Sequence, residues 1–293
     1  MKAKNFVVLL YVALVWAGAI AFVKFEEKTI PPIIIMAGRA LLAFLTLFAA
    51  SLIMKKDLRG NLKHVVHFLV FAILGITLLW VGLALGQEYI TVGLASVLVT
   101  TLPLITFVIL VLILRQQPFR AEGFAGLLIG FLGIIFVIGF ERILHGGSTM
   151  LGVLLIGGGF VCLAINGILA AKWARGIDPV ITTTYFLGLG TIFLVAFAFI
   201  FESPLETKWS FDNILSELML GAVCTASGYF GYYYLLRNAG AYFTSFIFYF
   251  IPVFGLVVGY MVFDEKVTGI QMVGVVLVLV GVYMINKKGG FKG

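Results

Sequence analysis

Apolar runs of about twenty residues recur along the whole chain, separated by short polar segments that hold most of the charge. An apolar run of about 18 residues or more is long enough to cross a bilayer as an α-helix. No stretch is left over for a soluble domain. The pattern predicts ten membrane-spanning helices, over residues 5–23, 33–54, 65–86, 91–114, 121–140, 151–171, 180–200, 212–236, 241–263 and 268–286.

Composition supports the same class of protein. Of the 293 residues, 62% are apolar and 11% are charged, whereas soluble domains carry about 25% charged residues. The mean hydropathy is +1.16. We therefore expect an all-α, polytopic protein of the lipid bilayer. Cys162 and Cys224 fall inside apolar runs, which is typical of small buried residues rather than of a disulfide or a metal site.

The distribution of basic residues predicts the orientation in the membrane. Of the 20 Lys and Arg residues, Arg39 lies within a span and fourteen fall on the side of the N-terminus. The positive-inside rule then places both termini in the cytoplasm, in a multi-pass protein of the cytoplasmic (inner) membrane. Because the net charge of +7 is dispersed over short loops, it does not indicate nucleic-acid binding. The five basic residues of the outer side are Lys24, Lys28, Arg142, Lys208 and Lys266.

The two halves of the chain resemble each other at a spacing of 148 or 149 residues. A unit of this length holds five spans, and since five is odd, the second unit must enter the membrane from the opposite face. We expect an inverted repeat, 1–145 and 146–293, which is typical of secondary transporters. A signal peptide cleaved at Ala17–Gly18–Ala19 would break this symmetry. The matching pairs include Lys24 and Lys172, Pro31 and Pro179, Trp80 and Tyr229, Gly82 and Gly231, Ser96 and Ser245, and Pro103 and Pro252.

The segment VWAGAIAFVKFEEKTIPPIIIMAGRALLAF (15–44) resembles the opening of the drug/metabolite transporter superfamily, in its EamA-type branch. The matching positions are Trp16, Lys24, Pro31 or Pro32, and Arg39. Glu265 matches the family's glutamate after the ninth helix. The resemblance covers about 6–285, and its specificity comes from the order of the motifs across both halves.

This resemblance implies ten helices in two inverted halves, with a central cavity formed by helices one to four and six to nine. It also implies the movement of small metabolites, commonly the export of amino acids or drugs. Two positions depart from a symmetric pattern. The first half has Gln117 where the second has Glu265, and Leu187 stands where an arginine would match Arg39.

Aromatic residues within the spans are the first candidates for a substrate site. Trp16 lies mid-span, and a buried indole N–H needs a partner. Tyr229 and Tyr232 share a face of the eighth span, and Ser245 and Tyr249 share a polar-edged stripe on the ninth. Trp80, the counterpart of Tyr229, lies in the outer half of its span. The alternatives are packing between helices and the aromatic belt at the membrane interface.

Polar residues and prolines within the spans are further candidates. Ser96 and Thr100 mirror the stripe of the ninth span, although such hydroxyls can instead bond to carbonyls of their own helix. Asn166 is costly in lipid and must face protein or water. Pro103 and Pro252 each remove a backbone donor, which makes both residues candidate hinges for alternating access.

Arg39 is the clearest charge within a span, roughly 9 Å below the predicted helix start at 1.5 Å per residue. It can snorkel to the outer interface, pair with a nearby glutamate, or anchor a substrate carboxylate. We expect no Asp, Glu or His to be buried mid-span. Coupling to protons, if it occurs, would then use Glu88 or Glu265 at the outer ends of spans.

These features predict a secondary transporter that moves a small-molecule substrate by alternating access. The aromatic candidates favour amphipathic solutes such as amino acids. A broad exporter of drugs or organic cations is the alternative, followed by a channel or a multispan protein without transport. No cofactor or metal is expected, and no Gly-Lys-Ser/Thr loop indicates ATP use. An enzyme is not expected, because the Asp, Glu and His residues lie at loops or span ends. Substrate identity and oligomeric state stay open.

Overall fold

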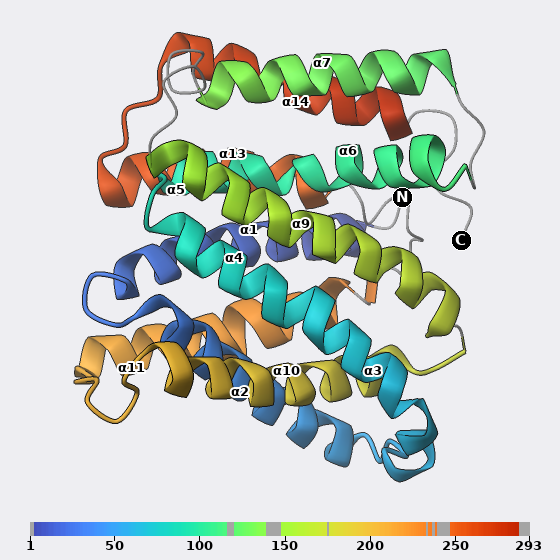
Figure 1. The fold of residues 1–293 in the computed structure, drawn as a ribbon, viewed down its shortest axis with the longest axis vertical. Coiled ribbons are helices and arrows are strands. Elements are labelled where there is room, and N and C mark those ends of the chain that lie inside the picture. Colours follow the sequence, from blue (N-terminus) through green and yellow to red (C-terminus); the bar gives the residue numbers. More distant parts are fainter. Residues whose placement is uncertain are drawn as a thin grey trace.

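A computed structural model of the chain describes residues 3–115, 120–138, 148–174, 176–232, 234–235, 238 and 247–286. These residues form helices and connecting turns, and no strand occurs among them. The protein is thus an all-α polytopic membrane protein. The helices run across the molecule between two loop-bearing ends, and the labelled N- and C-terminal ends lie towards the same end (Figure 1).

Several of the predicted spans are built from more than one helical segment. The α-helices and short helical segments of the described residues are α1 (Ala3–Glu26), α2 (Pro32–Ile53), η1 (Arg59–His64), α3 (Val65–Ala72), η2 (Ile73–Thr77), α4 (Leu78–Gln87), α5 (Val92–Val99), α6 (Thr101–Phe107), η3 (Val108–Ile113), α7 (Ala121–Ile138), α9 (Ser148–Trp173), α10 (Pro179–Phe201), α11 (Phe211–Leu218), η4 (Met219–Ser227), α13 (Ile247–Phe263) and α14 (Gly269–Asn286).

Within the described part of the chain, 7 helices are long and apolar enough to cross a membrane. Shorter apolar helices over 121–137, 250–263 and 269–281 lie where the fifth, ninth and tenth spans are expected. The count of ten spans therefore stays a prediction. One helix boundary differs from the prediction, since α1 continues to Glu26, whereas the predicted first span ends at residue 23. Glu26 therefore belongs to the helix and not to the loop that follows it.

Two π-helical segments widen the third and eighth predicted spans at corresponding positions. In η2, the hydroxyl of Thr77 donates to the carbonyl of Ala72 at 3.1 Å. In η4, the hydroxyl of Thr225 donates to the carbonyl of Leu220 at 2.7 Å. Each threonine thus reaches a carbonyl five residues earlier, and the two are 148 positions apart. Such insertions often mark functional sites.

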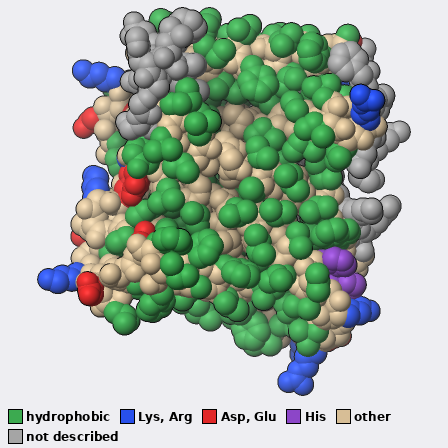
Figure 2. All heavy atoms as spheres, in the orientation of Figure 1, with side chains coloured by type: hydrophobic (Ala, Val, Ile, Leu, Met, Phe, Trp, Pro, Cys, Tyr) green, Lys and Arg blue, Asp and Glu red, His purple; other side chains and the backbone are tan. Residues whose placement is uncertain are grey.

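Figure 2 shows an apolar belt between two ends where the charged side chains gather. The belt includes exposed side chains such as Ile192, Phe199 and Met261. Lipid tails can cover apolar surface of this extent, which a soluble monomer rarely exposes. The charged ends mark the two borders of the membrane.

Helices α7 and α14 pack side by side along one edge of the molecule (Figure 1). A Cβ added to Gly274 would lie 2.7 Å from the carbonyl oxygen of Gly133, and one added to Gly281 would lie 2.5 Å from that of Gly126. Glycines at these positions let the two backbones touch. This contact agrees with the glycine pattern of the sequence and lies away from α1 and α2 (Figure 1).

A Gly274→Ala variant is expected to be destabilised by about 1–3 kcal/mol, because the new methyl group meets backbone on the facing helix. The matched control is Gly269→Ala, where an added Cβ meets nothing within 4 Å. The melting temperatures of the two purified variants in detergent provide the measurement. Equal melting temperatures would mean that the α7–α14 contact is looser than described.

Candidate functional site

An aromatic cluster surrounds Trp16 near the middle of α1. The Trp16 ring lies 5.8 Å from that of Tyr229 and 5.6 Å from that of Tyr232, centroid to centroid. Phe248 and Phe186 extend the cluster, at 6.3 Å from Trp16 and 5.7 Å from Tyr229 respectively. The structure thus brings three of the predicted aromatic site residues into direct contact.

The bare backbone at Gly228 makes room for the indole. A Cβ added to Gly228 would lie 2.3 Å from Nε1 of Trp16. The residues after η4 therefore hold the ring against the main chain, and the two tyrosines pack beside it. Any larger residue at position 228 would push Trp16 out of place.

Arg39 and Trp80, each predicted separately as a site residue, form a pair beside this cluster. The guanidinium carbon of Arg39 lies 4.3 Å from the centroid of the Trp80 ring, a cation–π contact. Nε of Arg39 donates to the Thr225 hydroxyl at 2.8 Å. The guanidinium is thus fixed on α2 by α4 and by the π-helical segment η4. Arg39 does not snorkel to the interface.

Trp16, Arg39 and Trp80 lie on α1, α2 and α4, and the two tyrosines directly follow η4. Helix α2 contacts α1, α4 and η4, and α1 also contacts η4. Trp80 is buried, whereas Trp16, Arg39, Tyr229 and Tyr232 each keep part of their surface accessible. A central cavity lined by these side chains stays a prediction. A guanidinium and several aromatic faces in one place can bind a small solute that has both a charged and an apolar end.

Two acidic side chains lie buried beside Arg39, near the ends of their spans, a place that the expectation about mid-span carboxylates did not cover. Glu26, on the last turn of α1, is 0% exposed, and Glu217, on α11, is 4% exposed. Ser216 donates to Oε1 of Glu26 at 2.5 Å, and the two carboxyl groups lie within hydrogen-bonding reach of each other. Arg39 is close enough to attract both.

The side chain of Glu217 rests on the backbone of α2. A Cβ added to Gly38 would lie 2.0 Å from Oε1 of Glu217. Among the described residues, no N–H or hydroxyl donor forms a hydrogen bond with either oxygen of Glu217 or with Oε2 of Glu26. Thr29 and Asn213 extend this polar group towards the turn between α1 and α2 through hydrogen bonds of 3.2–3.3 Å.

At the end of the bundle where α1 ends and α2 begins, carboxylates of the second half hold helix N-termini of the first half. Glu265 accepts hydrogen bonds from the backbone N–H groups of Val92 (2.7 Å) and Gly93 (2.9 Å) at the start of α5. Glu202 does the same for Ile33 (3.0 Å) and Ile34 (2.8 Å) at the start of α2. Carboxylates are favoured at such positive helix ends. Burial raises the pKa of Glu202, and the two N–H groups partly oppose this shift.

The same end of the bundle also holds a recess of about 480 Å³, lined in part by Glu88, Glu265 and Lys24. Nζ of Lys24 donates to the carbonyl of Gln87 at 2.6 Å and pairs with Glu27. Burial raises the pKa of Glu27, while Lys24 opposes this effect. Glu88 is exposed, and its role in coupling stays a prediction, as does that of Glu265.

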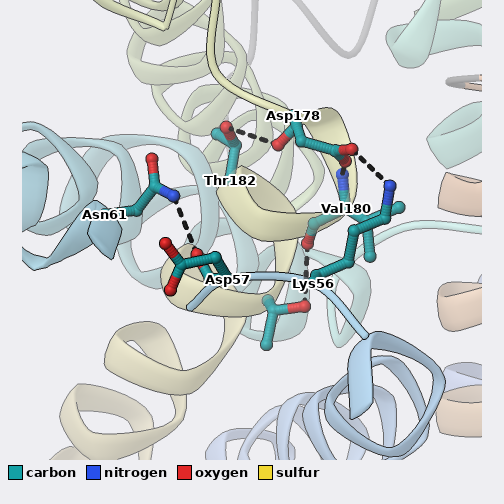
Figure 3. A network of polar contacts seen from close by, with 7 residues as sticks. Lys56, Asp57, Asn61, Asp178, Val180 and Thr182 are labelled. Atoms are coloured by element: carbon teal, nitrogen blue, oxygen red, sulfur yellow. Dashed lines mark hydrogen bonds and ion pairs between the residues drawn. The ribbon is translucent and has the colours of Figure 1, made fainter. Parts of the chain in front are cut away.

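At the opposite end of the bundle, where α2 ends and α10 begins, polar contacts join these two helices (Figure 3). Nζ of Lys56 lies 2.6 Å from Oδ2 of Asp178, and Oδ1 of Asp178 accepts from the backbone N–H of Val180 at 2.8 Å. The hydroxyl of Tyr185 donates to the carbonyl of Leu58 at 2.7 Å. Partial burial raises the pKa of Asp178, but Lys56 and the Val180 N–H outweigh it and leave that pKa lowered.

An Asp178→Asn variant is expected to lose the ion pair and keep the helix cap, whereas Asp178→Ala loses both. The Lys56–Asp178 pair is partly exposed and contributes about 0.2–1 kcal/mol, and the cap adds about 1 kcal/mol. A double-mutant cycle with Lys56→Met, read from melting temperatures at pH 7, measures the coupling. Because the carboxyl pKa is lowered on folding, the coupling is complete above the ordinary Asp pKa and disappears as pH falls through the lowered value. A coupling that persisted below that range would contradict the assignment.

Ser96 and Thr100 use their hydroxyls within their own helix. Ser96 donates to the carbonyl of Gly93 and Thr100 to that of Val97, at 2.7 and 2.6 Å. Both side chains are buried, and Ser96 packs on Gly255 of α13. Asn166 lies against Gly75 of η2, so it faces protein as expected. A part for these three residues in the site stays a prediction.

The hinge candidates lie in different surroundings. The fourth predicted span is interrupted at Thr100, and Pro103 lies in the first turn of α6, where it has no N–H to donate. Pro252 is buried inside α13, which is continuous from Ile247 to Phe263. Ser245 and the side chain of Tyr249 lie outside the described residues. The hinge role stays a prediction.

The comparison with known protein families now adds to this geometry. The EamA-like transporter family matches the chain twice, over residues 4–139 and 150–287. The chain belongs to this family. The protein is therefore a multi-pass membrane transporter of the drug/metabolite type, which points away from catalysis.

Relatives and a solved structure are similar along nearly the whole length. An "Uncharacterized transporter" of Archaeoglobus fulgidus is 28% identical over 98% of this chain and 99% of its own. The "Uncharacterized transporter YoaV" of Bacillus subtilis is 25% identical over 94% of both chains. A crystal structure with 14% identity superposes with a TM-score of 0.68, over 97% of this chain and 96% of the other. That likeness concerns the fold alone.

Proposed function

We propose that this protein is a secondary transporter that exports amino acids or related amphipathic solutes across the cytoplasmic membrane by alternating access. The observation that carries the proposal is the contact of Trp16, Tyr229 and Tyr232 beside the Arg39–Trp80 pair. A carboxylate on the solute would bind the Arg39 guanidinium. Its apolar side chain would lie against the aromatic rings.

The family repeat and the end contacts support alternating access. Two matched units are related by a spacing of 148 residues, and each contains one π-helical segment in its third span. Polar contacts join the two units at both ends, through Glu202 and Glu265 outside and through Lys56 and Asp178 inside. If the contacts at one end opened while those at the other end stayed closed, the predicted central cavity would be accessible from one side of the membrane at a time.

Export of organic cations is the second candidate, and one observation favours it. The acidic pair of Glu26 and Glu217 lies beside the aromatic group, and cations bind carboxylates and aromatic faces together. Arg39 opposes this alternative, because its positive charge repels a cation.

Uptake into proteoliposomes of labelled amino acids and organic cations tests the proposal. The expected result is saturable uptake of apolar and aromatic amino acids, which is lost in a Tyr229→Ala variant and kept in Tyr260→Ala. Tyr260 is 66% exposed on the outside of α13, so it serves as the matched control. Uptake of organic cations without amino acids would establish the second candidate, and uptake of neither would overturn both.

A further inference from the structure

A buried carboxyl pair lies beside the proposed substrate anchor, and the proposed function does not yet use it. Glu26 and Glu217 are 0% and 4% exposed, and oxygens of both lack an N–H or hydroxyl donor among the described residues. The backbone N–H of Arg39 lies near Glu217 without forming a hydrogen bond. A fully buried, unpaired carboxylate oxygen costs several kcal/mol, so this arrangement needs a ligand.

A proton is the ligand that fits. Two carboxyl groups within hydrogen-bonding reach can bond to each other only if one of them carries a hydrogen. Like charges at this separation also cannot both persist away from water. A single shared proton therefore joins one oxygen of each carboxyl group and removes the repulsion.

Counting charges around the pair gives a neutral cluster. Arg39 contributes one positive charge, and the pair with one proton contributes one negative charge. The other titratable groups facing Arg39 are Tyr229 and Cys224, which are neutral near pH 7. Among the helices packed on α1 and α11, α5 carries no titratable side chain, and the sequence of α13 offers only tyrosines.

We propose that Glu26 and Glu217 form a proton-binding site that keeps this cluster electrically neutral, so that the charge of the transported solute sets how many protons move with it. The inference rests on the proposed function and replaces Glu88 and Glu265 as the expected coupling groups. An anionic solute on Arg39 brings a second proton onto the pair and travels with it. A cationic solute displaces the shared proton into the water on that side. A zwitterion leaves the proton where it is.

Three solutes of similar shape and different net charge test this rule. The probes are phenylalanine, N-acetylphenylalanine and trimethyl(2-phenylethyl)ammonium, which carry zero, negative and positive net charge at pH 7. Proteoliposomes receive a gradient of one pH unit, alkaline inside. One proton per solute corresponds to about a tenfold concentration ratio. Wild type is expected to accumulate the anion inside, exclude the cation, and bring phenylalanine to equal concentrations.

Glu217→Gln and Glu26→Gln are expected to lose the response of both charged probes to the gradient. The rate of phenylalanine exchange, which moves no proton, should fall by a smaller factor than the gradient-driven accumulation or exclusion of the charged probes. The matched control is Glu206→Gln, because Glu206 is exposed in the loop before α11 and should behave as wild type. A gradient response that survives in both pair variants, or equal driving of all three probes, would overturn the proposal.

Infrared spectra of the purified protein provide a readout that needs no transport. Wild type is expected to show the carbonyl band of a protonated carboxyl group near neutral pH, and Glu217→Gln should lose it while Glu206→Gln keeps it. Absence of the band in wild type would overturn the proton site even if solutes move. If the band is present and none of the probes crosses, the proposed function fails and the coupling rule fails with it.

Discussion

An Arg39→Met variant is expected to lose about 100-fold in kcat/KM for solutes that carry a carboxylate, because truncating one side of a buried charge pair typically costs 2–5 kcal/mol. The same change leaves Glu26 and Glu217 without their cation, and removal of one partner of a buried ion pair destabilises a protein by about 3–5 kcal/mol. Initial uptake rates against concentration and the melting temperature provide the two measurements.

Further substitutions separate the two effects of losing Arg39. Adding both Glu26→Gln and Glu217→Gln to Arg39→Met removes the unpaired negative charge, so this triple variant should recover most of the stability and none of the carboxylate uptake. Leu187→Met is the matched control, because Leu187 occupies the corresponding position of the second half and is 0% exposed. Recovery of uptake in the triple variant would show that Arg39 only balances the acidic pair.

A Trp16→Ala variant is expected to lower the uptake of aromatic amino acids by about 10- to 100-fold, because edge and tilted contacts between rings, together with the buried ring area, contribute a few kcal/mol. Small amino acids without a ring should be affected less. Trp16→Phe should keep most of the activity. Kinetic constants for phenylalanine and alanine in the same vesicles measure this difference.

Trp209→Ala is the control for the loss of an indole. Trp209 is 38% exposed in the loop that precedes α11. It should lose neither uptake nor selectivity. Equal losses for phenylalanine and alanine in Trp16→Ala would mean that Trp16 supports the helix packing and does not contact the solute.

Much of the cluster was predictable because its members stand out against apolar surroundings. Trp16, Arg39 and Tyr229 each carry a polar group that cannot be left in lipid, and such groups must meet inside the bundle. The contact of Arg39 with Trp80, by contrast, depends on how α2 and α4 pack. The spacing of residues along one helix does not show which residues of two helices meet.

The buried acidic pair was not singled out because the sequence analysis ended the first span at residue 23 and placed the glutamates at loops or span ends. Helix α1 continues to Glu26, which then points at α11. A signal was present, since Asn213, Ser216 and Glu217 have i, i+3 and i+4 spacing and all three are buried. A polar stripe of this kind at the start of an otherwise apolar span indicates a buried polar site.

Ser96 and Thr100 illustrate the opposite risk, which is to predict a binding face where the hydroxyl groups bond only within their own helix. Hydroxyls at helical spacing resemble a binding face, yet both donate to carbonyls of their own helix. A sequence cannot separate these two uses, because a Ser or Thr rotamer decides between them.

Counterflow in proteoliposomes tests the central claim most directly, because it separates a carrier from a channel. Vesicles loaded with unlabelled phenylalanine are diluted into a trace of labelled phenylalanine. A carrier that alternates between two sides should accumulate the label transiently above its external concentration, in wild type and Trp209→Ala but not in Tyr229→Ala. Label that only equilibrates, without an overshoot and equally in all three proteins, would contradict alternating access through the Trp16–Tyr229 site.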